Sequence, residues 1–256
     1  MQFANAIVRI PGRNFAQALS ASGGQPDLAK ALEQHSAYRN ALAECGVELT
    51  TLCADEIHPD ATFVEDTFVI AERVAIATRP GADSRLGEVS AVAAALGRYR
   101  PHCERIEPPG RLDGGDICQV DEHFLIGRSA RTNEAGAAQL AAILARHGYT
   151  SSSIDIRSCP SLLHLKSGIT YLGGRRFLVA EGFPTTQQIA AGERIEVSPA
   201  EAYAANAVRV NDHILIAAGF PHLASSLAKL PCRVRALEMS EFAKMDGGLS
   251  CLSLRF

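Results

Sequence analysis

The sequence predicts a closed α/β fold made of radially repeated units, and two observations lead to this prediction. First, an apolar run, a short polar turn and a second apolar run recur along the chain, which is typical of a β-hairpin. The first strands of these hairpins begin at residues 67, 117, 169 and 207, and this self-similarity indicates a diverged repeat. Second, stretches with helical periodicity lie between the hairpins. Residues 1–256 are therefore expected to form a single ring-shaped domain.

The first unit of the ring is expected to be shared between the two ends of the chain. Residues 7–10 are predicted as a strand, residues 27–45 as a helix that Gly46 ends, and residues 47–52 as a second strand. Residues 252–256 alternate between apolar and polar side chains, as a strand does. They can supply the strand that the first unit lacks, so both termini should meet in one unit.

The four hairpins and their helices complete the predicted element list. Asn133 is placed to cap a helix over residues 134–147, and Gly148 is placed to end it. A second helix is expected over residues 86–98. The hairpins themselves span residues 67–77, 117–127, 169–180 and 207–217. Five hairpin-plus-helix units result.

Composition excludes several classes of protein. The net charge is -3, which argues against a nucleic-acid surface or a polybasic membrane face. No apolar run approaches the roughly 18 residues of a membrane span, and the N-terminus shows no secretion signal, so we expect a cytoplasmic protein. None of the seven cysteines forms a Cys-x-x-Cys pair, and in such a chain we expect reduced thiols.

Polar and reactive side chains gather at equivalent places in the units, immediately before the first strand of each hairpin. If the units surround a common axis, these side chains must converge there. They are Glu65 and Asp66, Asp113 and Asp116 around two glycines, His164 with Lys166, Asn206, and Cys251 after Gly247 and Gly248.

Each of these residues could also have a purely structural role. Cys251 could be a buried strand thiol and His164 a half-buried core histidine. Asp113 and Asp116 could simply begin a hairpin turn. Adjacent acids at Glu65-Asp66, in an otherwise apolar strand entry, are harder to explain unless they meet a cation.

The cation that best fits these acids is organic. The sequence has no metal-binding motif such as His-Glu-x-x-His, a Cys/His cluster or a calcium loop. A guanidinium is planar, permanently charged and matched bidentately by carboxylates. A thiol, a histidine and paired acids together indicate nucleophilic attack on a guanidinium carbon.

Two arginines suggest what else the ligand carries. Arg85 and Arg131 lie just beyond the first two hairpins, and either alone would be read as a solvated surface residue. As a pair they could hold an α-carboxylate, while Asp60 could take an α-ammonium group. The acids then outnumber the arginines, which favours an arginine-like substrate with a net positive charge.

With these residues assembled, the chain resembles the dimethylarginine dimethylaminohydrolases of the guanidine-modifying superfamily. The resemblance extends over nearly the whole chain and implies a fivefold pseudosymmetric α/β propeller, the pentein fold. The motifs that carry it, in order, are Pro59-Asp60, Phe63-Val64-Glu65-Asp66, Arg79-Pro80-Gly81 with Arg85, Leu112-Asp113-Gly114-Gly115-Asp116, Ser129-Ala130-Arg131-Thr132-Asn133, Leu163-His164-Leu165-Lys166-Ser167-Gly168, Ala205-Asn206 and Asp246-Gly247-Gly248-Leu249-Ser250-Cys251.

The resemblance also implies a role for each site residue. Cys251 would be the nucleophile, His164 the general acid and base, and Asp113 the carboxylate that orients His164, a position where some relatives have Glu. Substrate would be bound at its guanidinium nitrogens by Glu65 and Asp66, at its α-carboxylate by Arg85 and Arg131, and at its α-amino group by Asp60 and the backbone carbonyl of Leu19. Met245, through its backbone, and Asp246 would complete the substrate-binding set.

The expected reaction is hydrolysis of asymmetric dimethylarginine, and of monomethylarginine, to citrulline and an amine through a covalent Cys251 thiouronium. Neither a cofactor nor a metal is expected, and the only expected partner is the small-molecule substrate, with a homodimer left open. Three alternatives remain open. Arginine deiminases share the site logic and release ammonia, but they carry an added helical domain. A non-catalytic propeller would not need the thiol–histidine pair, and a papain-like amidase would have its cysteine early in the chain.

Overall fold

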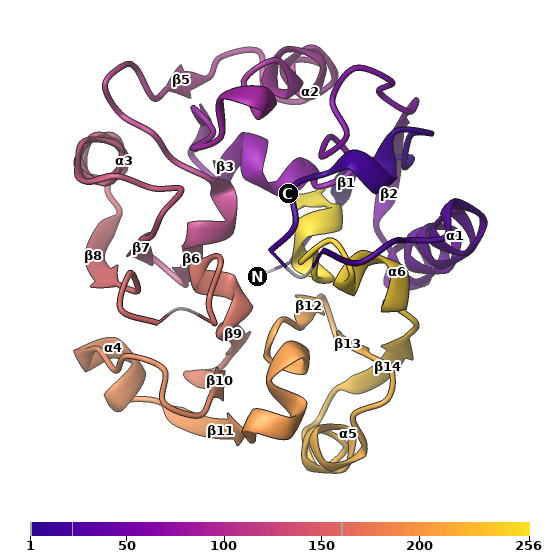
Figure 1. The fold of residues 1–256 in the computed structure, drawn as a ribbon. Coiled ribbons are helices and arrows are strands. Elements are labelled where there is room, and N and C mark those ends of the chain that lie inside the picture. Colours follow the sequence, from indigo (N-terminus) through magenta and orange to yellow (C-terminus); the bar gives the residue numbers. More distant parts are fainter. Residues whose placement is uncertain (1, 22, 160) are drawn as a thin grey trace.

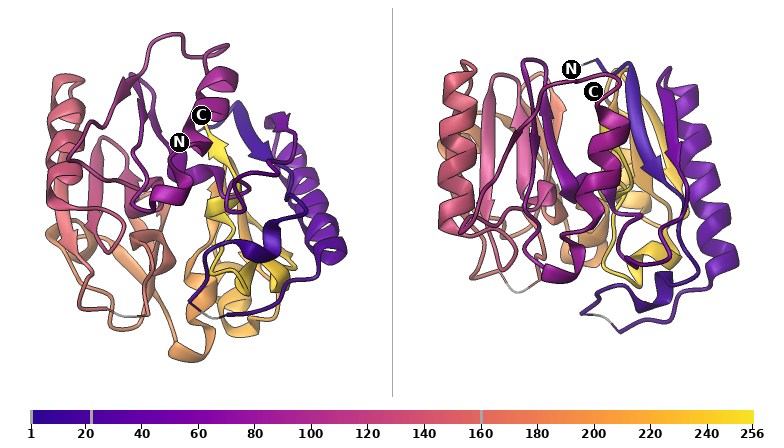
Figure 2. Two further views of the ribbon diagram at one scale, coloured as in Figure 1. Left: turned by 45° about the horizontal axis from the view of Figure 1, so that its top comes forward. Right: turned by 90° about the horizontal axis from the view of Figure 1, so that it is seen from above.

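A ring of five units around a central axis makes up the structure, a computed structural model that describes residues 2–21, 23–159 and 161–256 (Figure 1). Each unit contributes one three-stranded sheet, and the helix that links the two parallel strands of a unit lies outside the sheet, on the circumference. Viewed from the side, strands and helices run roughly along the ring axis, and both termini lie at the same end (Figure 2). The predicted fivefold α/β propeller is therefore confirmed.

All units share one connectivity, which the second hairpin illustrates. Strand β6 (Ile117–Val120) pairs antiparallel with β7 (His123–Arg128), which pairs parallel with β8 (Thr150–Asp155). Helix α3 (Glu134–Arg146) connects β7 to β8, because parallel neighbours require a crossover. The corresponding elements are β3 (Phe68–Ala71), β4 (Val74–Ala77), α2 (Glu88–Leu96) and β5 (Glu104–Arg105); β9 (Ile169–Gly173), β10 (Arg176–Ala180), α4 (Gln187–Ala190) and β11 (Glu193–Val197); and β12 (Val208–Val210), β13 (His213–Ala217), α5 (Pro221–Leu227) and β14 (Arg233–Leu237).

The first unit is closed by the two ends of the chain, as predicted. Strand β1 (Asn5–Arg9) pairs parallel with β2 (Glu48–Leu52) across helix α1 (Leu28–Glu44), and antiparallel with β15 (Leu254–Arg255). Backbone hydrogen bonds from Ala4 and Asn5 to the carbonyl of Phe256 extend this pairing. The unit that closes the ring therefore has the same strand order as the other four units.

Local sequence signals account for the helix ends. The Asn133 side chain accepts a hydrogen bond from the Gly136 amide and caps α3, and Gly148 follows that helix with φ of +78°. Asp27 caps α1 in the same way. Leu140 and Leu144 of α3 are fully buried against the sheets, as the helical periodicity predicts. In the part of the chain that the structure describes, no helix is both long and apolar enough to cross a membrane.

Two features differ from the sequence-based expectation. The third strand was predicted for the first unit, where residues 47–52 correspond to β2, but not for the other four units. For example, β5 has only two residues, and β8 begins Thr-Ser-Ser-Ser, without apolar alternation. Short 3-10 helices precede the first strands, and Cys251 lies in one of them rather than at a strand start. These are η2 (Val64–Thr67), η4 (Gly114–Asp116), η5 (Leu165–Ser167), η6 (Pro199–Ala205) and η7 (Ser250–Leu252).

Candidate active site

The 3-10 turns bring the predicted reactive side chains to one end of the ring. A cavity of about 1070 Å³ lies there, and Cys251 contributes to its wall. Leu163 and Ser167, on either side of His164 in sequence, line the same cavity, as do Asn206 and Asp246. The turns η2, η4 and η5 bring Asp66, Asp113 and His164 together, and η7 holds Cys251 within reach of the charges of Glu65 and Asp66.

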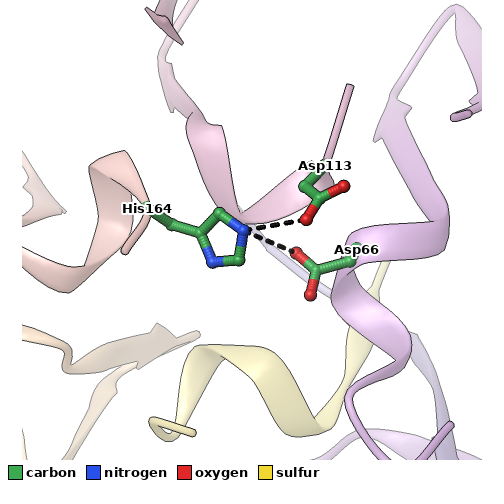
Figure 3. Close-up of side chains that lie close together, drawn as sticks. All are labelled: Asp66, Asp113 and His164. Atoms are coloured by element: carbon green, nitrogen blue, oxygen red, sulfur yellow. Dashed lines mark hydrogen bonds and ion pairs between the residues drawn. The ribbon is translucent and has the colours of Figure 1, made fainter. Parts of the chain in front are cut away.

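Nε2 of His164 faces two carboxylates, those of Asp113 and Asp66 (Figure 3). This nitrogen lies 2.9 Å from Oδ2 of Asp113 and 3.9 Å from Oδ1 of Asp66, and all three side chains are buried. A Cβ on Gly115 would lie 2.8 Å from the imidazole, so the glycine is needed for this close approach. Burial lowers the pKa of His164, but the charge of Asp66 and the hydrogen bond to Asp113 outweigh it and raise that pKa to about 9. The imidazole is therefore a cation at neutral pH.

Asp113 is fixed on both sides of its carboxylate. Oδ1 accepts a hydrogen bond of 2.7 Å from the Gly81 amide, which leaves Oδ2 for His164. The Asp113 amide in turn donates to the Thr132 hydroxyl at 3.2 Å. The shorter side chain at this position therefore still reaches the imidazole that it is predicted to orient.

Asp66 joins the imidazole to a buried arginine. One oxygen accepts from the Gly115 amide at 2.9 Å, and the other accepts from Nη1 of Arg85 at 2.6 Å. Burial raises the pKa of Asp66, but the cations of His164 and Arg85 outweigh it and lower that pKa to about 2. Asp66 is therefore ionised.

Cys251 is a protonated thiol in this arrangement. Its Sγ accepts a hydrogen bond of 3.4 Å from the Gly248 amide. Burial, followed by the negative charges of Glu65 and Asp66, raises the pKa of Cys251 to about 12. A cation that neutralised these carboxylates would reverse the electrostatic part of this shift and favour the nucleophilic thiolate.

Glu65 is engaged by cations of the protein itself. Oε1 lies 2.7 Å from Nζ of Lys166 and 3.1 Å from Nη2 of Arg255, and Oε2 accepts from the Ser250 hydroxyl at 2.7 Å. Glu65, Lys166 and Arg255 also line a second cavity of about 150 Å³, enclosed by first strands of the units around the ring axis. Glu65 thus lies between the axis and the turn that carries Cys251.

Arg85 is almost completely buried, with 4% of its surface exposed, and lies in a dense polar network. Its Nε donates to both oxygens of Glu88 at 3.0 and 3.1 Å, and its Nη2 donates to Glu88 and to the Phe63 carbonyl. Burial lowers the pKa of Arg85, but Asp66 and Glu88 raise it well above its usual value. Sequence reasoning missed Glu88, although its spacing of three residues from Arg85 is a helical contact spacing.

Asp60, Arg131 and the loop containing Leu19 form a second group. The Leu19 amide donates to both oxygens of Asp60 at 3.1 and 3.3 Å. Burial raises the pKa of Asp60, and the positive charges of Arg85 and Arg131 act against this shift, so these cations lie near the carboxylate. Within the described residues, the half-buried Arg131 guanidinium has no hydrogen-bond or ion-pair partner.

Met245 and Asp246 begin the segment that leads to the nucleophile. Met245 is buried in the apolar cluster between the first unit and the unit of β12 to β14, whereas Asp246 has a positive φ of 55° and lines the large cavity. Oδ2 of Asp246 accepts from the Ala21 amide at 2.5 Å, and this bond ties the Leu19 loop to the cavity mouth. Ser22, the next residue in the sequence, lies outside the described residues.

Asp116 is a further buried acid whose contacts the sequence did not reveal. Its oxygens accept from the Leu165 amide at 2.9 Å and from the hydroxyls of Ser129 and Thr132, each at 2.6 Å. It therefore fixes the turn that follows His164 against the segment that carries Arg131. Asp116 is therefore more than the turn residue that its sequence position suggests.

Asp66, Asp113 and His164 offer ligand atoms within 4.8 Å of one another, a spacing that a metal ion could use. The charges of these carboxylates are already neutralised by Arg85, 2.6 Å from Asp66, and by the imidazolium of His164. Both positive groups would repel a metal cation placed there. That the protein needs no metal stays a prediction.

Comparisons with known proteins agree with this geometry. An arginine deiminase family model matches residues 92–217. The chain is 44% identical over 256 residues to the N(G),N(G)-dimethylarginine dimethylaminohydrolase of Pseudomonas aeruginosa, covering 99% of this chain and 100% of that protein. The Streptomyces coelicolor protein of the same description is 34% identical over 252 residues, or 98% of this chain and 96% of the relative.

Solved structures extend the comparison. The Pseudomonas aeruginosa enzyme complexed with citrulline has a TM-score of 0.96 at 43% identity, with 100% of both chains covered. The N-terminal domain of ArgZ, an arginine dihydrolase from cyanobacteria, shares the fold with a TM-score of 0.88 at 20% identity, over 100% of this chain and 97% of that one. On its identity to full-length relatives, the chain belongs to the N(G),N(G)-dimethylarginine dimethylaminohydrolase family.

Proposed function

We propose that the protein hydrolyses asymmetric dimethylarginine to citrulline and dimethylamine, and monomethylarginine to citrulline and methylamine. The observation that carries the proposal is a half-buried thiol, Cys251, whose pKa is raised to about 12 by burial and by the negative charges of Glu65 and Asp66. Asp66 also faces the imidazolium of His164. The Cys251 thiol of such a site stays protonated and unreactive until a cation binds beside the carboxylates. The guanidinium group of a methylated arginine is such a cation. The relatives are named for this activity.

Substrate binding activates the nucleophile in this proposal. The guanidinium lies against Asp66 and Glu65, and its positive charge offsets the carboxylates that disfavour the thiolate. A guanidinium held beside Cys251 is also oriented for addition of the sulfur to the face of its planar carbon, which reduces the entropic part of the barrier. The substrate thus supplies part of the electrostatics that its own cleavage needs.

The chemistry has two steps. As the substrate cation binds, the Cys251 thiol loses its proton to solvent, and the thiolate adds to the guanidinium carbon. The imidazolium of His164 protonates the methylated nitrogen, and the carbon–nitrogen bond breaks to release dimethylamine. A thiouronium remains on Cys251. His164, now neutral, takes a proton from water, and the resulting hydroxide adds to the same carbon. The carbon–sulfur bond then breaks, and the departing thiolate takes the proton of the new hydroxyl group, which restores the thiol and releases citrulline. Asp113 and Asp66 stabilise the imidazolium that this cycle consumes and regenerates.

The amino-acid end of the substrate lies in the second group of residues. Arg131 is proposed to bind the α-carboxylate directly, since its guanidinium is half-buried and has donors available. Asp60 and the Leu19 backbone carbonyl take the α-ammonium group, and Met245 and Asp246 border the pocket. Arg85 acts on the same carboxylate from the buried side, through the network it forms with Asp66 and Glu88.

The released amine tests the proposal directly. Purified protein is incubated with arginine, monomethylarginine and asymmetric dimethylarginine, and ammonia, methylamine, dimethylamine and citrulline are quantified. We expect citrulline with equimolar dimethylamine from asymmetric dimethylarginine, and no product from Cys251→Ser protein. Ammonia from arginine as the preferred reaction would establish a deiminase instead, the activity suggested by the family model over residues 92–217. No product from any of the three would favour a binding protein.

We further propose that residues 1–256 act as one catalytic domain that needs no cofactor, with the cytoplasm as its compartment. Activity of protein dialysed against a chelator tests the first part, since loss of turnover restored by a metal would contradict it. Light scattering at assay concentration distinguishes a monomer from a homodimer.

A further inference from the structure

Asn206 occupies, in the fourth hairpin unit, the place where other units carry reactive groups, yet the mechanism above gives it no role. It follows η6 and precedes β12, and its side chain is buried at the cavity wall. A buried amide with four hydrogen-bonding positions is costly unless those positions are used. Its partners therefore indicate what it does.

The amide makes three hydrogen bonds, and both of its N–H groups are used. Oδ1 accepts from the Ser250 backbone amide at 2.9 Å, and this donor fixes which end of the side chain is oxygen. Nδ2 donates to the Ser250 hydroxyl at 3.0 Å and to the Lys166 backbone carbonyl at 3.0 Å. One side chain thus spans two turns that are distant in sequence.

Those two turns carry the two proposed reactive groups. Ser250 directly precedes Cys251 in η7, and Lys166 lies in η5, the turn that His164 begins. The amide also packs against the glycine turn, because a Cβ on Gly248 would lie 2.5 Å from the Asn206 side chain. The Gly248 amide is the group that donates to Sγ of Cys251, so this turn bears on the thiol itself.

We propose that Asn206 is a positioning residue that joins the nucleophile's turn to the base's turn and so fixes Cys251 relative to His164. This rests on the proposed roles of Cys251 and His164. Asn206 acts through Ser250, Gly248 and Lys166, and not on the reacting atoms. Nearby Tyr203 is the contrasting case, because its hydroxyl donates to the Gly247 carbonyl at 2.7 Å and supports the nucleophile's turn alone.

The chain offers a matched control in Asn211. Its Oδ1 accepts from the Phe3 amide at 2.8 Å, and its Nδ2 donates to the carbonyls of Phe3 and Cys45 at 3.1 and 2.8 Å. It therefore makes the same set of bonds as Asn206, but in the β12–β13 turn, at the opposite end of β12. Asn→Asp at either position keeps the acceptor and removes both donors.

The experiment compares Asn206→Asp, Asn206→Ala and Asn211→Asp with wild-type protein. Steady-state kcat and KM with asymmetric dimethylarginine are measured below the melting temperature of every variant, with the folded fraction determined by circular dichroism. The rate of Cys251 alkylation by iodoacetamide is measured against pH, with the modified peptide identified by mass spectrometry. The alanine variant separates the loss of the amide from the added charge of aspartate.

If Asn206 positions the two turns, both Asn206 variants lose about 10- to 100-fold in kcat with KM changed less than about threefold, as a misplacement near 1 Å does. The pH midpoint of Cys251 alkylation also moves in both, whereas Asn211→Asp matches wild type in kcat and alkylation. Asn206 variants with wild-type kcat and alkylation, or losses no larger than their unfolded fraction, would overturn the proposal. Absence of amine release by wild-type protein would instead refute the proposed function, and the alkylation profile would still test the Asn206 contacts.

Discussion

The two arginines that the sequence assigns to one task lie in different physical settings. Arg85 is almost fully buried and bonded to Asp66, Glu88 and a backbone carbonyl, whereas Arg131 is half-buried and has no side-chain partner among the described residues. A saturated, buried guanidinium costs much to move, and a free one is available to a ligand. The difference indicates that Arg85 holds the site together and that Arg131 meets the substrate.

The largest expected effect is that of Arg85→Ala on stability. Removing one partner of a buried ion network leaves Asp66 and Glu88 uncompensated, which costs about 3–5 kcal/mol in the free energy of unfolding. Urea denaturation followed by circular dichroism measures this loss. If Arg85→Ala unfolds at the wild-type urea concentration, then Arg85 is no more structural than Arg131 and the comparison fails.

His164→Gln tests the catalytic group that the Arg85 network supports. We expect kcat to fall by about 10²- to 10⁴-fold, since general acid–base catalysis is lost while the substrate contacts remain. Stopped assays with amine quantification measure the residual rate. A variant that keeps more than a tenth of wild-type kcat would mean that another group transfers the proton.

Arg131→Gln should change binding without changing stability. Losing a charge-assisted hydrogen bond of about 1.5–3 kcal/mol should raise KM roughly 10- to 100-fold, with kcat within a few-fold. The same variant should unfold at the wild-type urea concentration. Arg131→Lys, which keeps the charge but not the fork, should be intermediate, and a KM unchanged in both variants would exclude a role in carboxylate binding.

The pH dependence of the unfolding free energy should distinguish the buried network around Arg85, which includes His164, from the surroundings of Arg131. The pKa of His164 is raised to about 9, so the stability from its contact with Asp66 and Asp113 is complete below the unfolded pKa near 6.5. This stabilisation is lost as pH rises through about 9. The difference in unfolding free energy between wild type and His164→Gln should therefore shrink from pH 6 to pH 10, while the corresponding difference for Arg131→Gln stays constant. If both differences are constant, His164 is not an imidazolium at neutral pH.

Asp246→Asn should have the smallest effect. Asparagine tolerates the positive φ at this position and keeps an acceptor for the Ala21 amide, but the bond loses its charge. KM should rise roughly two- to fivefold, since only a charge-assisted bond weakens to a neutral one. A fall in kcat larger than the rise in KM would place Asp246 closer to the chemistry than the cavity mouth.

Much of the ring could be predicted from the sequence, because the hairpins have apolar strands and recur as similar segments along the chain. Strand β8 could not, since Thr150 to Ser153 is polar on both faces and takes its place only by pairing parallel with β7. Convergence of the reactive residues followed from their equivalent positions before first strands. Repeat position thus carries information that local strand patterns lack.

The contacts between site residues were beyond the sequence. Position alone could not show that Glu65 meets Lys166 and Arg255 rather than open solvent, nor that Glu88 faces Arg85. Burial decides both, and burial depends on how neighbouring units pack around the axis. For the same reason Arg85 and Arg131 could not be distinguished from the sequence.

The most direct test of the account is to look for the covalent intermediate. Protein with and without the His164→Gln substitution is mixed with asymmetric dimethylarginine, quenched in acid within the first turnovers, and digested for mass spectrometry. We predict that the peptide containing Cys251 gains the mass of the substrate less dimethylamine, that none of the other six cysteines does, and that the adduct persists longer in the variant. Turnover to citrulline and dimethylamine by Cys251→Ser protein, or an adduct on any other residue, would contradict it.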